Sequence, residues 1–131
     1  MPIMKQLTVA LENKPAQLSK LSAALSRARI NIVALTVLDS VEASLVRLVP
    51  DNAATAKRLI KKLNLPCTAK RVLVYKMSAG SGTMARATRR LAKAGINVDY
   101  VYGSEPAGEG HGLIVFGVKD PKKAEAILKG E

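Results

Sequence analysis

A segment of about 20 residues occurs twice in this chain of 131 residues. Residues 13–32 read NKPAQLSKLSAALSRARINI, and 66 positions further along residues 79–98 read AGSGTMARATRRLAKAGINV. Leu25 then aligns with Leu91, and Asn31 aligns with Asn97. A repeat of this kind indicates two copies of one structural unit. Because units of about 65 residues are only marginally stable alone, we expect the two to pack on each other.

Hydrophobic periodicity predicts the order strand, helix, strand, strand, helix, strand for the first copy. Pro15 suits a first helical turn, because its backbone carries no N–H and its φ is preset. Residues 32–38 are apolar on both faces, so we expect this strand to be covered on both sides. The predicted strands span residues 5–11, 32–38, 43–49 and 67–71, with helices from the residue-13 loop to about residue 29 and over 53–63.

The second copy repeats this pattern but lacks an obvious fourth strand, because the chain stops after the last predicted helix. Gly95 is placed to end a helix in the left-handed conformation, and Asp120 is placed to cap the helix that follows. We therefore predict two units, residues 1–70 and 71–131, with the last strand of the second short or missing. The second unit has predicted strands at 72–77, 97–103 and 112–118, helices at 83–94 and 122–129, a loop at 78–82 and a turn at 105–110.

Composition argues against several classes of function. Cys67 is the only cysteine, so no intrachain disulfide forms, which favours a reducing cytoplasm. No apolar run approaches the roughly 20 residues of a membrane span, and the N-terminus lacks the pattern of a signal peptide. His111 is the only histidine, and no close pair of carboxylates suggests acid–base chemistry. We expect no enzyme activity, no catalytic residue, no metal site, no cofactor and no membrane partner.

The net charge of +11 is spread evenly, with +6 in the first 66 residues and +5 in the remainder. Such a balance attracts nucleic acid, anionic ligands or acidic partners, and it equally describes a solvated surface. We interpret the basic residues on the paired helices as solvated outer faces. They are Arg27, Arg29, Arg86, Arg89, Arg90 and Lys93.

Two equivalent strand-to-helix loops are the candidate binding features. Free N–H groups at a helix N-terminus favour an anion, such as the carboxylate of an amino acid. Residues 13–17 and 78–82 both precede a predicted helix. Asn31 and Asn97 occupy matching strand starts, where an Asn either bonds to its own backbone or presents an amide to a ligand.

These residues resemble the opening of an ACT domain. In that family the loop often reads Asn-x-Pro-Gly-x-Leu, and the helix is followed by Gly-Ile-Asn-Ile. The first copy supplies Asn13, Pro15, Leu18 and Ile30-Asn31-Ile32, with Ala16 and Arg29 in place of the glycines. The second copy supplies Gly82, Met84 and Gly95-Ile96-Asn97-Val98, with Ala79 and Ser81 in place of the Asn and Pro.

The resemblance implies a fold of the α/β (α+β) class. Each unit would be a ferredoxin-like βαββαβ sandwich, with an antiparallel sheet and helices on one face. It also implies a non-catalytic regulatory module that binds a small amino acid between ACT units and controls a partner enzyme of amino-acid metabolism. The ligand-binding residues carried over are Asn13, Lys14, Pro15, Ala16, Gln17, Leu18, Asn31, Ile32, Gly80, Ser81, Gly82, Thr83, Met84, Asn97 and Val98.

The two loops are not equivalent as ligand sites. The methyl group of Ala16 would hinder close backbone approach by a ligand and disfavours a positive φ. We therefore favour the second loop for backbone contacts to a carboxylate. The predicted strand 32–38 needs a partner on its second face, and a homodimer follows as a hypothesis.

Two alternatives stay open at this stage. One is a basic ferredoxin-like protein that binds nucleic acid, although we do not expect nucleic acid as the partner. Recognition by base stacking is disfavoured because aromatic residues are sparse. The same argument does not apply to binding through phosphates alone. The other is an ACT pair that binds no small ligand and contacts only a protein.

Overall fold

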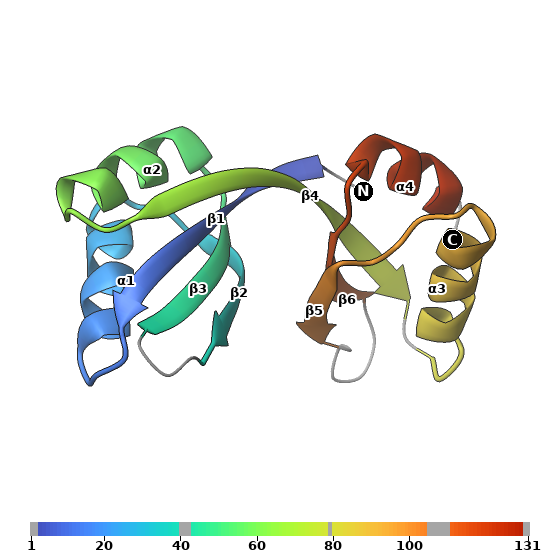
Figure 1. Cartoon of the computed structure of the whole chain (residues 1–131), viewed down its shortest axis with the longest axis horizontal. Coiled ribbons are helices and arrows are strands. Elements are labelled where there is room, and N and C mark those ends of the chain that lie inside the picture. Colours follow the sequence, from blue (N-terminus) through green and yellow to red (C-terminus); the bar gives the residue numbers. More distant parts are fainter. Residues whose placement is uncertain (1–2, 40–42, 79, 105–110, 130–131) are drawn as a thin grey trace. The chain divides into compact units, whose positions relative to one another are not determined.

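A computed structural model describes residues 3–39, 43–78, 80–104 and 111–129 (Figure 1). The turn predicted at 105–110, and also Ser40 and Ala79, lie outside the described residues. The six strands follow the order β2-β3-β1-β4-β6-β5 within one hydrogen-bonded sheet, and the pairs β1–β3, β2–β3, β4–β6 and β5–β6 are all antiparallel. The elements in chain order are β1 (Ile3–Glu12), α1 (Gln17–Arg27), β2 (Ile32–Leu38), β3 (Ala43–Pro50), α2 (Ala53–Lys62), β4 (Cys67–Ser78), α3 (Thr83–Lys93), β5 (Tyr100–Ser104), β6 (His111–Gly117) and α4 (Pro121–Leu128).

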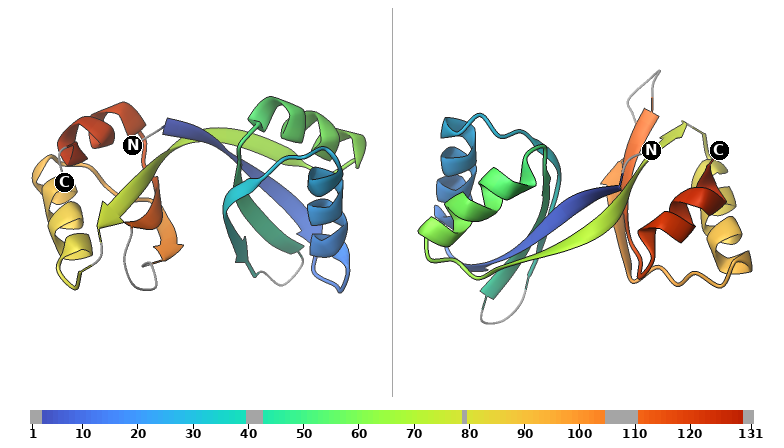
Figure 2. Two further views of the ribbon diagram at one scale, coloured as in Figure 1. Left: turned by 180° about the vertical axis from the view of Figure 1, so that it is seen from behind. Right: turned by 90° about the horizontal axis from the view of Figure 1, so that it is seen from above.

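The fold class is the predicted one, with ferredoxin-like α+β units. In each unit both helices lie against one face of the strands (Figure 2). The strand predicted over 32–38 is β2, with the same bounds. The strands predicted at 67–71 and 72–77 form one continuous strand, β4, because no turn residue separates them. The strand predicted from residue 97 begins only at Tyr100, because the chain bends at Asp99 and pairing with β6 starts at Tyr100 opposite Gly117.

Contacts divide the chain into two compact units. The first unit is Lys5–Lys70, and the second consists of Arg71–Glu131 together with Met1–Met4. Ile3 at the start of β1 packs against the hydrophobic core of the second unit. Among the described residues no strand follows α4, and the second unit includes a segment from the start of the chain.

Each unit has its own aliphatic core between the strands and two helices. In the first core Leu21 and Leu25 of α1 pack with Ile60 of α2 against β1 and β3. In the second core Leu91 of α3 and Leu128 of α4 occupy the corresponding layer. The buried faces repeat at helical spacing, as the amphipathic pattern predicts.

The helices end and begin with local motifs that the sequence specifies. Helix α3 ends in a Schellman motif, because Gly95 has a φ of 74° and the Ile96 N–H donates to the Leu91 carbonyl at 2.9 Å. Helix α1 ends in the same way, although Arg29 takes the left-handed position with a φ of 59°. Asn52 and Asp120 cap α2 and α4 by accepting backbone N–H bonds at 3.1 Å.

Strand β2 is not covered on both sides within one chain, contrary to the expectation from its composition. It stands at one end of the strand order, and Leu35, Val37 and Leu38 are 40%, 45% and 37% exposed. Apolar residues at a sheet edge are a common feature of protein–protein contact surfaces.

Candidate functional site

The loop between β1 and α1 borders a small cavity of about 150 Å³ in the first unit. Of the six loop residues predicted to bind ligand, the cavity is lined by Asn13, Lys14, Gln17 and Leu18, whereas Pro15 and Ala16 are exposed outside it. The base is apolar and comes from β1, β2 and β3. The remaining lining residues are Leu11, Glu12, Val37, Ser44 and Val46.

Polar groups around this cavity are held in place by neighbouring side chains. The Asn13 side-chain amide donates to Asp39 Oδ1 at 3.1 Å, and Lys14 Nζ lies 3.1 Å from Glu12 Oε2. The cavity therefore combines an ammonium group, one carboxylate and side-chain amides with apolar residues from the strands. Such a set can accommodate both charged ends of a zwitterion and a short apolar or hydroxyl side chain.

Helix α1 begins at this cavity without a side-chain cap. Its N-cap is Ala16, which adopts a left-handed conformation with φ 74° and ψ −10° and makes no side-chain hydrogen bond to the first turn. The first N–H groups of a helix have no partner inside the helix. In α1 they are available to solvent or to an anionic ligand.

The loop between β4 and α3 has the same character in the second unit. Helix α3 also lacks a side-chain cap, and its N-cap is Gly82. Gly80 has a φ of 142°, and its carbonyl accepts a bond of 2.9 Å from the hydroxyl of the buried Thr83. This loop is therefore shaped by Thr83, while Gly80 and Ser81 are exposed.

Arg86 lies beside the second loop, a position that was not predicted from the sequence. A Cβ atom built on Gly82 would lie 2.8 Å from Arg86 Nη1, so the guanidinium group lies directly over the loop. The sequence analysis grouped Arg86 with a solvated helix face. The spacing of Arg86 from Gly82 could have indicated this position, because a residue four positions after the N-cap lies one turn from the helix N-terminus, within reach of the loop.

The predicted residues Asn31, Ile32, Asn97 and Val98 lie at the other end of each helix. Asn31 and Asn97 follow the C-termini of α1 and α3, and each helix has 11 residues, or about 16 Å of rise (Figure 1). Within one unit the structure thus separates the loop residues from the Asn residues. Ile32, Met84 and Val98 pack against the hydrophobic cores.

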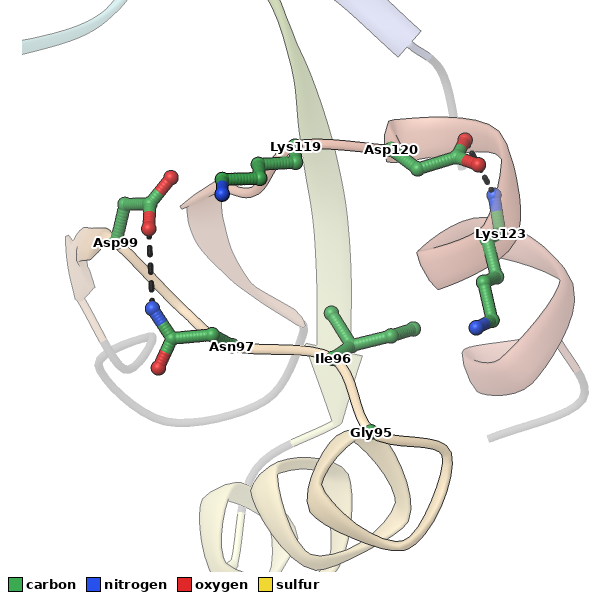
Figure 3. A pocket seen from close by; sticks show the side chains of 7 residues that line it. All are labelled: Gly95, Ile96, Asn97, Asp99, Lys119, Asp120 and Lys123. Atoms are coloured by element: carbon green, nitrogen blue, oxygen red, sulfur yellow. Dashed lines mark hydrogen bonds between the residues drawn. The ribbon is translucent and has the colours of Figure 1, made fainter.

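The two Asn residues have different surroundings. The Asn31 N–H donates to Asp51 Oδ1 at 3.1 Å, and the Asp51 N–H donates back to the Asn31 carbonyl at 3.0 Å. Asn97 borders a cavity of about 310 Å³ in which Lys119 and Lys123 are the cations (Figure 3). The other lining residues are Gly95, Ile96, Asp99 and Asp120.

The thiol of Cys67 is poorly suited to nucleophilic chemistry. Burial raises its pKa, and the nearby ammonium groups of Lys57 and Lys61 oppose that rise only in part. A raised pKa reduces the thiolate fraction at neutral pH.

None of the helices in the described part of the chain is long and apolar enough to span a membrane.

Comparison with known proteins identifies the architecture. A family model described as an ACT domain pair matches residues 1–130. No curated protein matches the sequence. Among solved structures, protein BT0572 from Bacteroides thetaiotaomicron superimposes with a TM-score of 0.88 at 22% identity, covering 97% of this chain and 87% of that one.

Two further structures have the same fold. The ligand-free regulatory subunit of aspartate kinase from Thermus thermophilus matches with a TM-score of 0.69 at 14% identity, over 96% of this chain and 89% of that one. The corresponding subunit from Thermus flavus matches with a TM-score of 0.61 at 17% identity, over 98% and 90%.

Proposed function

The chain belongs to the ACT domain family as a pair of such domains, and from this membership we propose that it is a non-catalytic amino-acid sensor. Its ligand is a small amino acid, and its target is an enzyme of amino-acid metabolism. The solved relatives include proteins described as regulatory subunits of aspartate kinase, which supports an enzyme as the target. We propose further that each compact unit is one ACT domain, with a boundary near residue 70, and that the protein acts in the cytoplasm.

The observation that carries the proposal is a difference between the four helix N-termini. Helices α2 and α4 are capped by the side chains of Asn52 and Asp120. Helices α1 and α3, which follow the two equivalent loops, have no side-chain cap. A carboxylate bound at either loop would accept hydrogen bonds from the uncapped N–H groups and interact favourably with the helix dipole.

The second loop has a further basis for carboxylate binding. The Arg86 guanidinium lies over Gly82 and is exposed, so it can pair with a carboxylate that approaches the α3 N-terminus. Charge-assisted bonds of this type are about twice as strong as neutral ones. We propose that the second loop is the stronger of the two sites.

The distance between the loop and Asn positions supports a site shared between ACT units. Since about 16 Å of helix separates these positions within a unit, a ligand that contacts both needs a loop from one unit and an Asn from another. At the first loop, Leu18 and Val37 line the cavity and are 38% and 45% exposed. A second copy that covers β2 would close this cavity, and we propose a homodimer.

The first test is a thermal-shift panel of the twenty amino acids at millimolar concentration. A ligand present at 100 times its dissociation constant adds roughly 2.7 kcal/mol, which raises the melting temperature by several degrees. A flat panel would refute amino-acid sensing and favour a module that contacts only a protein.

A matched pair of variants locates the site. Arg86→Gln is expected to weaken binding of the amino acid found in the panel at least tenfold, because it removes a charge-assisted bond of about 1.5–3 kcal/mol. Arg89→Gln makes the same change on the same helix, away from the loop, and should leave the shift unchanged. Equal effects of the two substitutions would argue against a carboxylate site beside Arg86.

The proposed dimer is tested separately. Sedimentation with saturating ligand should show two copies at micromolar concentration, and Val37→Lys on β2 should produce monomers. A wild-type monomer under these conditions would overturn the dimer.

A further inference from the structure

The positive charge, which is even along the sequence, is concentrated in the helices of the folded chain. The four helices carry 12 of the 21 Lys and Arg residues and only one of the ten acidic residues, Glu125. The rest of the chain carries nine residues of each sign. The net charge of +11 therefore arises from the helices alone.

Helix α2 in the first unit and helix α3 in the second carry most of this charge. Each has four basic residues and no acidic one. On α3 the basic positions follow the spacing i, i+3, i+4 and i+7, which places them on one face of the helix. They are Lys57, Arg58, Lys61 and Lys62 on α2, and Arg86, Arg89, Arg90 and Lys93 on α3.

These faces do not have the composition of a lipid- or protein-binding surface. Of the larger apolar side chains of the two helices, Ile60 and Leu91 are buried in the cores, and Leu59 and Met84 are partly buried against them. The other exposed positions are small, including Ala54, Ala85 and Ala92. A membrane-bound amphipathic helix needs an apolar face for insertion, and the anchors of protein interfaces are mainly Trp, Tyr and Arg, of which these faces supply only Arg.

A nucleic acid backbone does fit such a surface. Arg and Lys side chains bind phosphates, Arg often through two parallel bonds. Neither helix has an aromatic residue to stack on a base. We propose that the outer faces of α2 and α3 bind the phosphate backbone of a nucleic acid without reading its sequence.

The test is fluorescence anisotropy with two labelled 25-base-pair DNA duplexes of unrelated sequence. Equal affinities are expected for the two. The affinity should fall by about 150-fold between 50 and 200 mM salt if one helix neutralises four phosphates. No binding at 50 mM salt would overturn the proposal, and so would binding to phosphatidylserine vesicles without binding to DNA.

Charge-matched variants test the surface itself. Arg58→Glu with Arg89→Glu removes one exposed cation from each helix, and Lys5→Glu with Lys76→Glu makes the same charge change on exposed strand positions. The helix pair should weaken binding at least tenfold more than the strand pair and lower the salt slope by about 1 for each helix that is bound. Equal weakening would overturn the proposal.

Arg58→Gln with Arg89→Gln repeats the test if the glutamate pair unfolds. None of the substituted residues, Arg58, Arg89, Lys5 and Lys76, belongs to the proposed amino-acid sites, whereas Arg86 on the α3 face does. Loss of nucleic-acid binding therefore leaves the ligand-induced thermal shift as an independent result.

Discussion

Replacing Ala16 with glycine should stabilise this protein. Ala16 is the N-cap of α1 and has a φ of 74°, a conformation in which the Cβ of an L-residue is crowded. Its side chain is exposed and makes no capping bond, so the substitution removes one solvent-facing methyl and no packing. The equivalent position in the second repeat is Gly82, which has a φ of −101° and therefore does not share the left-handed conformation of Ala16.

The size of the effect follows from two opposing terms. Relief of the left-handed conformation contributes about 1–2 kcal/mol. The greater freedom of glycine in the unfolded chain subtracts about 0.5–1 kcal/mol. The net gain is therefore about 0.75 kcal/mol, the middle of a range of about 0 to 1.5 kcal/mol, which corresponds to a rise of roughly 3 °C in the melting temperature.

Urea denaturation and thermal melting followed by circular dichroism measure this gain. Ala23→Gly is the matched control, because Ala23 lies inside α1 in the right-handed conformation. There glycine should lower the stability by about 0.5–1 kcal/mol. If Ala16→Gly destabilises the protein as Ala23→Gly does, the left-handed assignment of Ala16 is wrong.

Three further predictions concern local features of the fold. Arg29→Gly should raise the stability by about 0.5–1 kcal/mol, since Gly95 has the same left-handed role in the second repeat; a decrease on urea denaturation would contradict this. Asp120→Ala should lower the stability by about 1 kcal/mol through loss of the α4 cap, and an unchanged melting temperature would show that the cap is dispensable. The folded state raises the pKa of Cys67, so its alkylation by iodoacetamide should have a higher pH midpoint than in the denatured chain. The same shift leaves the stability unaffected below the ordinary thiol pKa and lowers the stability as the pH rises above that value. An alkylation midpoint in the folded protein that is equal to or lower than that of the denatured chain would refute the raised pKa.

The local elements were largely predictable because their signals lie within a few residues of each other. The periodicity of Leu21 and Leu25 predicted α1, and Asp120 with Pro121 predicted the start of α4. Gly95 was correctly placed as a left-handed helix end. Each of these features depends on backbone geometry and neighbours along the chain.

The candidate site was predictable only in part. Both loops were located from the repeat, and four residues of the first loop do line a cavity. The sequence did not reveal that Asn31 and Asn97 lie a helix length away from the loops of their own units. It also did not reveal that Arg86 reaches back over Gly82, because an exposed basic residue on a helix has no signal for the direction of its side chain.

The sequence by itself determined the two repeats, the order of their elements, the helix ends and the family, because these depend on residue spacing and local conformation. Only the tertiary structure decided that Ile3 packs in the second core, that β2 keeps exposed apolar residues, and that the helices hold the net charge. Strand pairing joins residues far apart in the chain, and the face on which a charge lies depends on which helix side is buried. Neither is encoded within a short window of sequence.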